Sequence, residues 1–351
     1  MPAERLPPVA DLTPGDLGAM RLLLRGESVI DWHRLQFEDL DQVDRFLRVN
    51  EIDPSSDRDL LRLEEIRREA VGYLRRALDL DVPREVAERA SVRELLLLAS
   101  RPGPLAPSAC SVLKVMHVMH HLAGRALLFK LPVSDDEIFH LVEAKVMKVV
   151  EDVRGAGYPV VEFAWGRKQP DGLITKLLAK RATIAAHVYD KLRFRLITPR
   201  REDLPPLVRE LLHRLIPFNY VTPGESVNDL VDLPGAPPAS RPTSPGAGTG
   251  VVNEFSGPDF RIVSFVADLP VRLDDFIANV SPALARQYGS VVFVLTEFQL
   301  VDAATAAANE EGESSHERYK ERQYSQVRRR LAPPGPAAPT GGPSEGDRAG
   351  G

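Results

Sequence analysis

Apolar residues in the first 155 positions recur at intervals of three and four residues, which is the period of an amphipathic helix. The pattern is clear in DLGAMRLLLRG, DLDQVDRFLRV, DLLRLEEIRREAVGYLRRALDL and DDEIFHLVEAKVMKVVEDV. Residues that cap helices precede three of these segments, at Thr13-Pro14, Asp53-Pro54-Ser55-Ser56 and Ser134-Asp135-Asp136. We therefore predict a helical N-terminal region over residues 1–155.

The pattern changes after residue 155 to short runs of Val, Ile and Phe, which are typical of strands. Helical segments separate these runs, and they contain DGLITKLLAKR, REDLPPLVREL and VRLDDFIANV. Strands interleaved with helices predict a layered α/β or α+β domain over residues 156–331. The expected strands cover residues 158–165, 191–198, 260–269 and 290–301.

Two segments are low in complexity and rich in Pro and Gly, namely residues 234–250 and 332–351. Neither has enough apolar side chains to offset the entropy lost on folding. We expect a disordered loop inside the second domain and a disordered C-terminal tail.

The amino-acid composition indicates a globular protein and gives no sign of a membrane protein or of a general nucleic-acid-binding protein. The chain has 351 residues, of which 43% are hydrophobic and 27% charged, a balance typical of a soluble globular protein. Its formal net charge of -5 provides no global attraction to duplex nucleic acid. It shows neither a signal peptide nor an apolar run long enough for a membrane span. A single cysteine, Cys110, excludes an internal disulfide and is expected in the core, so we predict a cytoplasmic protein.

Polar side chains stand on two of the predicted strands. Glu297 and Gln299 are two residues apart on the last strand, so they project to the same side. Asp190 precedes the strand on which Arg193 and Arg195 alternate with apolar residues. If the two strands are neighbours, the two carboxylates converge, and a pair of acids suits Mg²⁺ and phosphoryl chemistry. A solvent-facing charged strand is the alternative.

A basic loop and helix, GRKQPDGLITKLLAKR, lie between the first two predicted strands. Lys176 and Lys180 are four residues apart and share one helix face, where a bound anion would relieve their repulsion. A solvated basic face is the other interpretation of this segment.

Four motifs in chain order resemble the RelA/SpoT synthetase domain of stringent-response alarmone synthetases. The segment from Lys168 to Lys176, KQPDGLITK, resembles the family's K-x-P-x-S-I-x-x-K. Asp190 stands five residues before Arg195, as in the family, and EFQ at 297–299 matches its E-x-Q. The segment GESSHERYK, residues 312–320, resembles the closing G-x-x-A-H-x-x-Y-K.

The resemblance implies an α+β fold: a helical N-terminal region followed by a mixed β-sheet, nucleotidyltransferase-like domain flanked by helices. It also implies transfer of pyrophosphate from ATP to the 3′-hydroxyl of a guanine nucleotide, GDP or GTP. Catalytic roles fall to Asp190, Glu297 and Gln299, with Asp190 and Glu297 holding Mg²⁺. Binding of the ATP phosphates is implied for Arg167, Lys168, Lys176 and Arg195. Stacking on the guanine base is implied for Phe255.

Departures from the family pattern leave a second function open. The acceptor segment has Glu254 in place of a glycine and no histidine, and Val301 replaces an arginine after the E-x-Q motif. Gly172 stands where the family has serine. A catalytically degenerate relative that binds a nucleotide or a protein partner is therefore the alternative to a pyrophosphotransferase. A helical interaction protein is a third interpretation, and a homo-oligomer is compatible with all three.

Histidines in the N-terminal region form a separate candidate site. His117 and His121 are four residues apart on one helical face, a spacing found in metal sites. Packing or interface histidines are the alternative. The H-D pair of the alarmone hydrolase domain is absent, so we expect no hydrolase activity.

Overall fold

The computed structural model describes residues 12–26, 36–179, 192–233, 257, 259–274, 276–277, 281–311 and 316–332. The expected loop at 234–250 and positions 333–351 of the expected tail lie outside these residues. Within the described part of the chain, no helix has the length and apolar character needed to cross a membrane.

The N-terminal region is helical, as the apolar periodicity predicts. Side-chain oxygens of Thr13, Ser56 and Ser134 each accept a backbone N–H in the first turn of a helix and cap it. The helices are α1 (Pro14–Arg25), α2 (Leu40–Val49), α3 (Asp57–Leu78), α4 (Val92–Ser100), α5 (Ala106–Lys130) and α6 (Asp135–Gly155), with a short π-helix at Glu85–Arg89.

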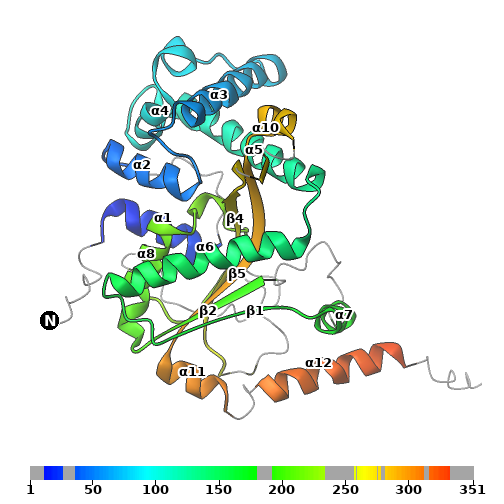
Figure 1. Ribbon diagram of the computed structural model, residues 1–351. Helices are drawn as coiled ribbons and strands as arrows, with labels where there is room; N and C mark the ends of the chain where they lie inside the picture. The colour runs from blue at the N-terminus through cyan, green and yellow to red at the C-terminus, as the bar shows by residue number, and fades with distance from the viewer. Residues whose placement is uncertain are drawn as a thin grey trace, which may run out of the picture.

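The second half forms a mixed sheet flanked by helices, which confirms the α+β prediction (Figure 1). The described residues give five strands in the order β1-β2-β5-β4-β3, in which β2 and β5 are parallel and the other pairs antiparallel. The strands are β1 (Glu162–Arg167), β2 (Leu192–Thr198), β3 (Val227–Asn228), β4 (Val263–Arg272) and β5 (Val291–Asp302). The helices are α7 (Pro170–Ala179), α8 (Leu204–Arg214), α10 (Pro282–Tyr288), α11 (Ala303–Asn309) and α12 (His316–Leu331).

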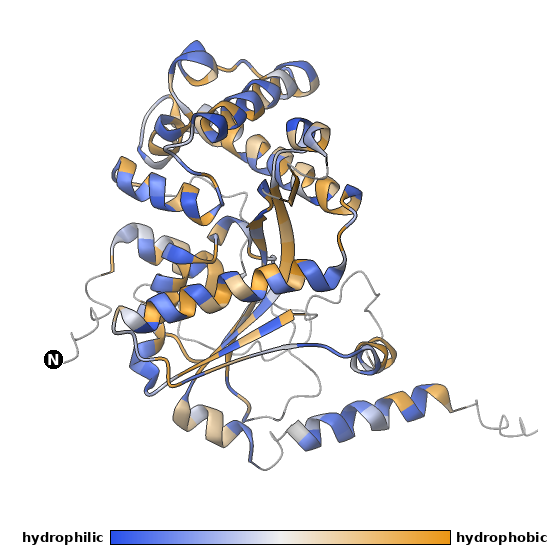
Figure 2. Ribbon diagram, in the orientation of Figure 1, coloured by the Kyte–Doolittle hydropathy of each residue, from blue (hydrophilic) through white to orange (hydrophobic). Residues whose placement is uncertain are grey.

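One face of the sheet carries a row of aromatic rings across four strands. Phe163, Phe194, Phe298 and Phe265 stack in that order, with ring centroids 6.0, 5.6 and 5.5 Å apart. Figure 1 shows α6 running across the strands, and Figure 2 shows that β4 and β5 are largely hydrophobic whereas α12 is mostly hydrophilic. Burial of these rings stabilises the sheet and fixes its register, because a slip of one residue would expose them.

Helix α5 approaches β5 very closely at Gly124. A Cβ atom at this position would lie 2.5 Å from Cδ2 of Phe293 and 2.7 Å from the carbonyl oxygen of Val291. Only glycine leaves room for this contact. Cys110, on the same helix, is buried as the sequence predicts.

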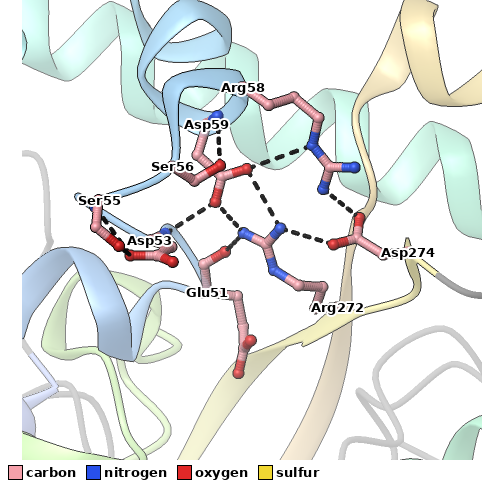
Figure 3. Close-up of polar contacts among 8 residues, drawn as sticks. All are labelled: Glu51, Asp53, Ser55, Ser56, Arg58, Asp59, Arg272 and Asp274. Carbon is pink, nitrogen blue, oxygen red and sulfur yellow. Dashed lines mark hydrogen bonds and ion pairs between the residues drawn. The ribbon is translucent and has the colours of Figure 1, made fainter.

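A cluster of charged side chains joins α3 to the end of β4 (Figure 3). The Arg272 guanidinium donates to the Asp59 carboxylate and the Glu51 carbonyl oxygen, and it lies 2.9 Å from Asp274. Arg58 donates to Asp274 over 2.6 Å. The helices and the sheet are thus held together by ion pairs as well as by one continuous hydrophobic cluster.

Candidate active site

A row of polar side chains crosses the face of the sheet opposite the phenylalanine rings. In the parallel pair of β2 and β5, Arg193 is the register partner of Glu297 and Arg195 is the partner of Gln299. Ser264 of β4 is the partner of Gln299 on the other side. The alternation on β2 is therefore as predicted, and the strand that Asp190 precedes is indeed next to the strand of Glu297.

Glu297 is the centre of this row. Its Oε2 accepts a hydrogen bond from Arg193 Nε over 2.9 Å, and its Oε1 accepts one from Gln299 Nε2 over 2.8 Å. Ser264 Oγ donates to the same Oε1 over 3.3 Å. The Glu297 side chain is 12% exposed, so these donors offset most of the hydration that its carboxylate has lost. Glu297 and Gln299 thus share one side of β5, as their spacing predicts.

The side of the row toward β1 is open. The β1 residues opposite Arg193 and Arg195 are Gly166 and Ala164, which carry little or no side chain. A Cβ atom at Gly166 would meet no other atom within 4 Å. Arg195 reaches Glu310 at 3.7 Å, and that carboxylate is 59% exposed, so this ion pair is weak and easily replaced. Among the residues that the structure describes, the polar face is therefore accessible from the β1 edge.

Val301 closes the other end of the row. Its side chain is completely buried and its register partner on β2 is Ile197. An apolar side chain thus occupies the position where the resembled family has an arginine, so this position adds no cation to the polar row.

Arg167 lies away from this face, contrary to the predicted role in phosphate binding. Its register partner is Leu192, whose side chain belongs to the buried face. Its guanidinium forms a bidentate pair with Glu143 of α6, at 2.7 and 2.8 Å, and contacts Asp136 at 2.8 Å. These contacts raise the pKa of Arg167, because the Glu143 carboxylate hydrogen-bonds to the guanidinium. The structure does not bring Arg167 to Glu297, since strand alternation places them on opposite sides of the sheet.

The predicted lysines belong to the segment that follows β1. Lys168 lies between β1 and α7, and Lys176 lies on α7. A Cβ atom at Gly172 would lie 3.5 Å from Cγ of Lys168, so the lysine stem lies against the first turn of α7. Asp190, Lys180 and Phe255 lie outside the described residues.

The oxygen donors of this face are those that Mg²⁺ prefers. In the part of the chain that the structure describes, no group of three or more His, Cys, Asp or Glu side chains is placed to hold a metal ion. Mg²⁺ is commonly held by one or two carboxylates and by the substrate phosphates, and the Glu297 carboxylate is a ligand of this kind.

The N-terminal histidines pack between α5 and the sheet. His121 Nε2 lies 2.7 Å from Asp268 Oδ2 on β4, and His117 stacks on Tyr220 with ring centroids 4.5 Å apart. Burial lowers the pKa of His117 to about 3 and that of His120 to about 4. These are the contacts of packed histidines, one of the two interpretations that the sequence left open. Their partners could not be predicted, because Asp268 is 147 residues from His121 in the chain.

No family model matches the chain, and no curated protein is similar to it. Similar solved structures include small alarmone synthetase 2 from Bacillus subtilis, with 13% identity over 56% of this chain and 93% of the other, at a TM-score of 0.31. Small alarmone synthetase 1 from the same organism, bound to its product pppGpp, has 13% identity over 61% and 90%, at 0.29. A GTP pyrophosphokinase family protein from Streptococcus pneumoniae has 13% identity over 55% and 83%, at 0.31.

Proposed function

We propose that the polar face of β2 and β5 transfers pyrophosphate from ATP to a hydroxyl group of a nucleotide, with GDP and GTP as the first candidate acceptors. One observation carries this proposal. Glu297 and Gln299 stand beside Arg193 and Arg195 on an accessible face, and β5 is the neighbour of the strand that Asp190 precedes. Burial of a carboxylate has a cost in free energy unless hydrogen-bond donors or cations compensate for it, and here the donors lie on the same face as the acid.

The proposed reaction needs a base and a set of cations. The acceptor oxygen attacks the β-phosphorus of ATP, the bond between that phosphorus and the bridging oxygen of the α-phosphate breaks, and AMP leaves. Glu297 accepts the proton of the attacking hydroxyl, and Gln299, bonded to it at 2.8 Å, holds the carboxylate in position. Lys168, Lys176 and Arg195 offset the charge of the phosphate chain. Mg²⁺ held by Asp190 and Glu297 supplies further charge neutralisation when it is bound.

Acceptor binding is assigned to the segment that contains Phe255. An aromatic ring can stack on a purine base, which gives Phe255 the role of the family's tyrosine. The substitutions around it, Glu254 above all, imply an acceptor preference different from that of the resembled enzymes.

A second function is a nucleotide-binding or partner-binding protein without turnover. Two observations favour it: both Glu297 oxygens already accept hydrogen bonds within the protein, and Val301 is buried where an arginine is expected. In that protein the Arg193–Glu297 pair would be structural.

A transfer assay separates the two functions. The purified protein is incubated with γ-labelled ATP, Mg²⁺ and a panel of GDP, GTP, other nucleotides and tRNA, beside an Asp190→Ala variant. Label on an acceptor with the wild type and none with the variant would support the enzyme. Saturable ATP binding by calorimetry with no labelled product would support the binding protein instead. If label is absent and ATP does not bind, the transferase and an ATP-binding protein are both wrong, and only binding of another nucleotide or of a protein partner is left.

A further inference from the structure

A pocket is lined by residues of α1, α2 and α8, none of which the proposed active site uses. Figure 1 shows these three helices next to one another. Its cavity volume is about 110 Å³. Apolar cavities of about 150 Å³ bind benzene, so this pocket, which is open at its mouth, suits a ligand built on a single ring. The short segment around Phe218 completes its wall.

Aromatic rings form the apolar part of the pocket. Phe46 stands between Phe37 and Phe218, with ring centroids 5.3 Å from each, and the rings are tilted by 50° and 33°. Ala19 and Leu212 line the same pocket. Such a surface suits a flat apolar or aromatic group.

The polar part of the pocket contains Asp16 with its two hydrogen-bond donors, and one further cation. Asp16 accepts hydrogen bonds from His213 Nε2 at 2.6 Å and from Arg209 Nε at 3.2 Å. Burial opposes its ionisation, but the hydrogen bond and the charge of His213, with the contacts to Thr13, outweigh this and lower the pKa of Asp16 far below 3.8. Arg209 also lies 3.6 Å from Glu210. Asp16, Arg209 and His213 therefore each have a hydrogen-bonding partner within the protein.

Arg45 is the cation that this cluster does not neutralise. It lines the pocket from α2 and is exposed. In the part of the chain that the structure describes, it forms no ion pair, and Asp41, one turn earlier, is not within ion-pair distance. A guanidinium in this position can form a charge-assisted, bidentate pair with an incoming carboxylate or phosphate.

We propose that this pocket binds a small organic anion, in which a flat aromatic ring lies on the phenylalanines and a single carboxylate or phosphate pairs with Arg45. Both halves of the ligand follow from the pocket: the three rings provide the apolar contact, and the net charge of its ionised side chains is positive. The site is independent of the proposed transferase function and does not require it.

Ligand-detected NMR on the full chain tests the proposal with three probes of one size. Phenyl phosphate and benzoate carry the ring and the anion, and benzamide carries the ring alone. We expect saturable binding of at least one anion, at least fivefold tighter than benzamide, because a charge-assisted pair contributes about a factor of ten. Comparison of phenyl phosphate with benzoate shows which acid the site prefers.

Three variants locate the binding. Arg45→Gln removes the cation at an exposed position and should weaken the anion at least fivefold while leaving benzamide unchanged. Ala19→Leu should fill the pocket and abolish binding of all three probes. Arg48→Gln removes an exposed arginine of the same helix that does not line the pocket, and should bind like the wild type.

The outcomes are decisive even if Ala19→Leu does not fold, because Arg45→Gln changes only an exposed side chain. Absence of saturable binding by both anions would overturn the proposal. Equal weakening by Arg45→Gln and Arg48→Gln would also overturn it, since the anion would then be held by general surface charge.

Discussion

Arg193 Nε donates to Glu297 Oε2 over 2.9 Å, from one parallel strand to its neighbour. The Arg193 side chain is 42% exposed and that of Glu297 only 12%, so the guanidinium covers the acid from the solvent side. A substrate phosphate at this face would compete with Glu297 for Arg193. The pair joins the two strands, and if the proposed transfer takes place on this face, a substrate phosphate can replace Glu297 as the partner of Arg193.

Replacement of Gly124 by alanine should destabilise the protein. The added methyl group would lie within 2.7 Å of both the Phe293 ring and the Val291 carbonyl oxygen, so α5 must move away from β5. We expect a loss of about 2–3 kcal/mol in the free energy of unfolding, despite a gain of about 1 kcal/mol in helix propensity. Urea denaturation measures this. Gly155→Ala is the matched control, because its Cβ would meet nothing within 4 Å. Equal midpoints for the two variants would show that α5 is not held against β5 here.

The Asp59–Arg272 pair should contribute more to stability than the neighbouring Arg58–Asp274 pair. The Asp59 side chain is 9% exposed, and its removal leaves the Arg272 guanidinium short of a partner. We expect Asp59→Asn to cost about 2–3 kcal/mol, below the range for fully buried pairs because Arg272 is partly exposed. Arg58→Gln, at a side chain that is 65% exposed, should cost less than about 1 kcal/mol. Chemical denaturation of both variants gives the comparison, which fails if Arg58→Gln is the more damaging.

The packed histidines should make the protein less stable in mild acid. Burial lowers the folded-state pKa of His117 to about 3 and of His120 to about 4, against 6.5 for an exposed histidine. Below pH 6.5 these two histidines bind protons in the unfolded chain but stay neutral in the folded chain. The free energy of unfolding is therefore not reduced by these histidines above pH 6.5. It falls as the pH drops toward 4, by up to about 1.4 kcal/mol per histidine per pH unit.

Urea midpoints at pH 7.5 and 5.0 measure this loss in the wild type and in a His117→Gln, His120→Gln double variant. The variant should lose less stability over the same interval. The lowered pKa of Asp16 acts only below its ordinary value of 3.8 and so lies outside this window. An identical pH dependence in both proteins would contradict the assignment.

Features set by local periodicity could be predicted from the sequence. Glu297 and Gln299 share a side because strand side chains alternate, and Arg193 and Arg195 follow the same rule on β2. The first helices were predictable because their caps and apolar periods agree. Helix α11 was missed because AATAAAN has no clear apolar face, and β3 because it has only two residues.

Pairs distant in sequence could not be predicted. Arg167 next to Lys168 suggested one basic loop, but alternation at the end of β1 turns Arg167 toward Glu143 of α6. The contact of His121 with Asp268 depends on how α5 lies on the sheet, and no local pattern encodes it.

The kinetics of a Glu297→Gln variant show whether pyrophosphate transfer depends on the Glu297 carboxylate. Glutamine keeps the size and the acceptor oxygen of glutamate but cannot take a proton. We therefore expect the rate of pyrophosphate transfer to fall about 100-fold or more. Glu162→Gln is the control, since Glu162 is an exposed acid on the same sheet face, opposite Ile197 at the edge strand. Its rate should stay within about twofold of the wild type. Wild-type transfer that persists undiminished in a folded Glu297→Gln protein would show that the chemistry does not occur on this face.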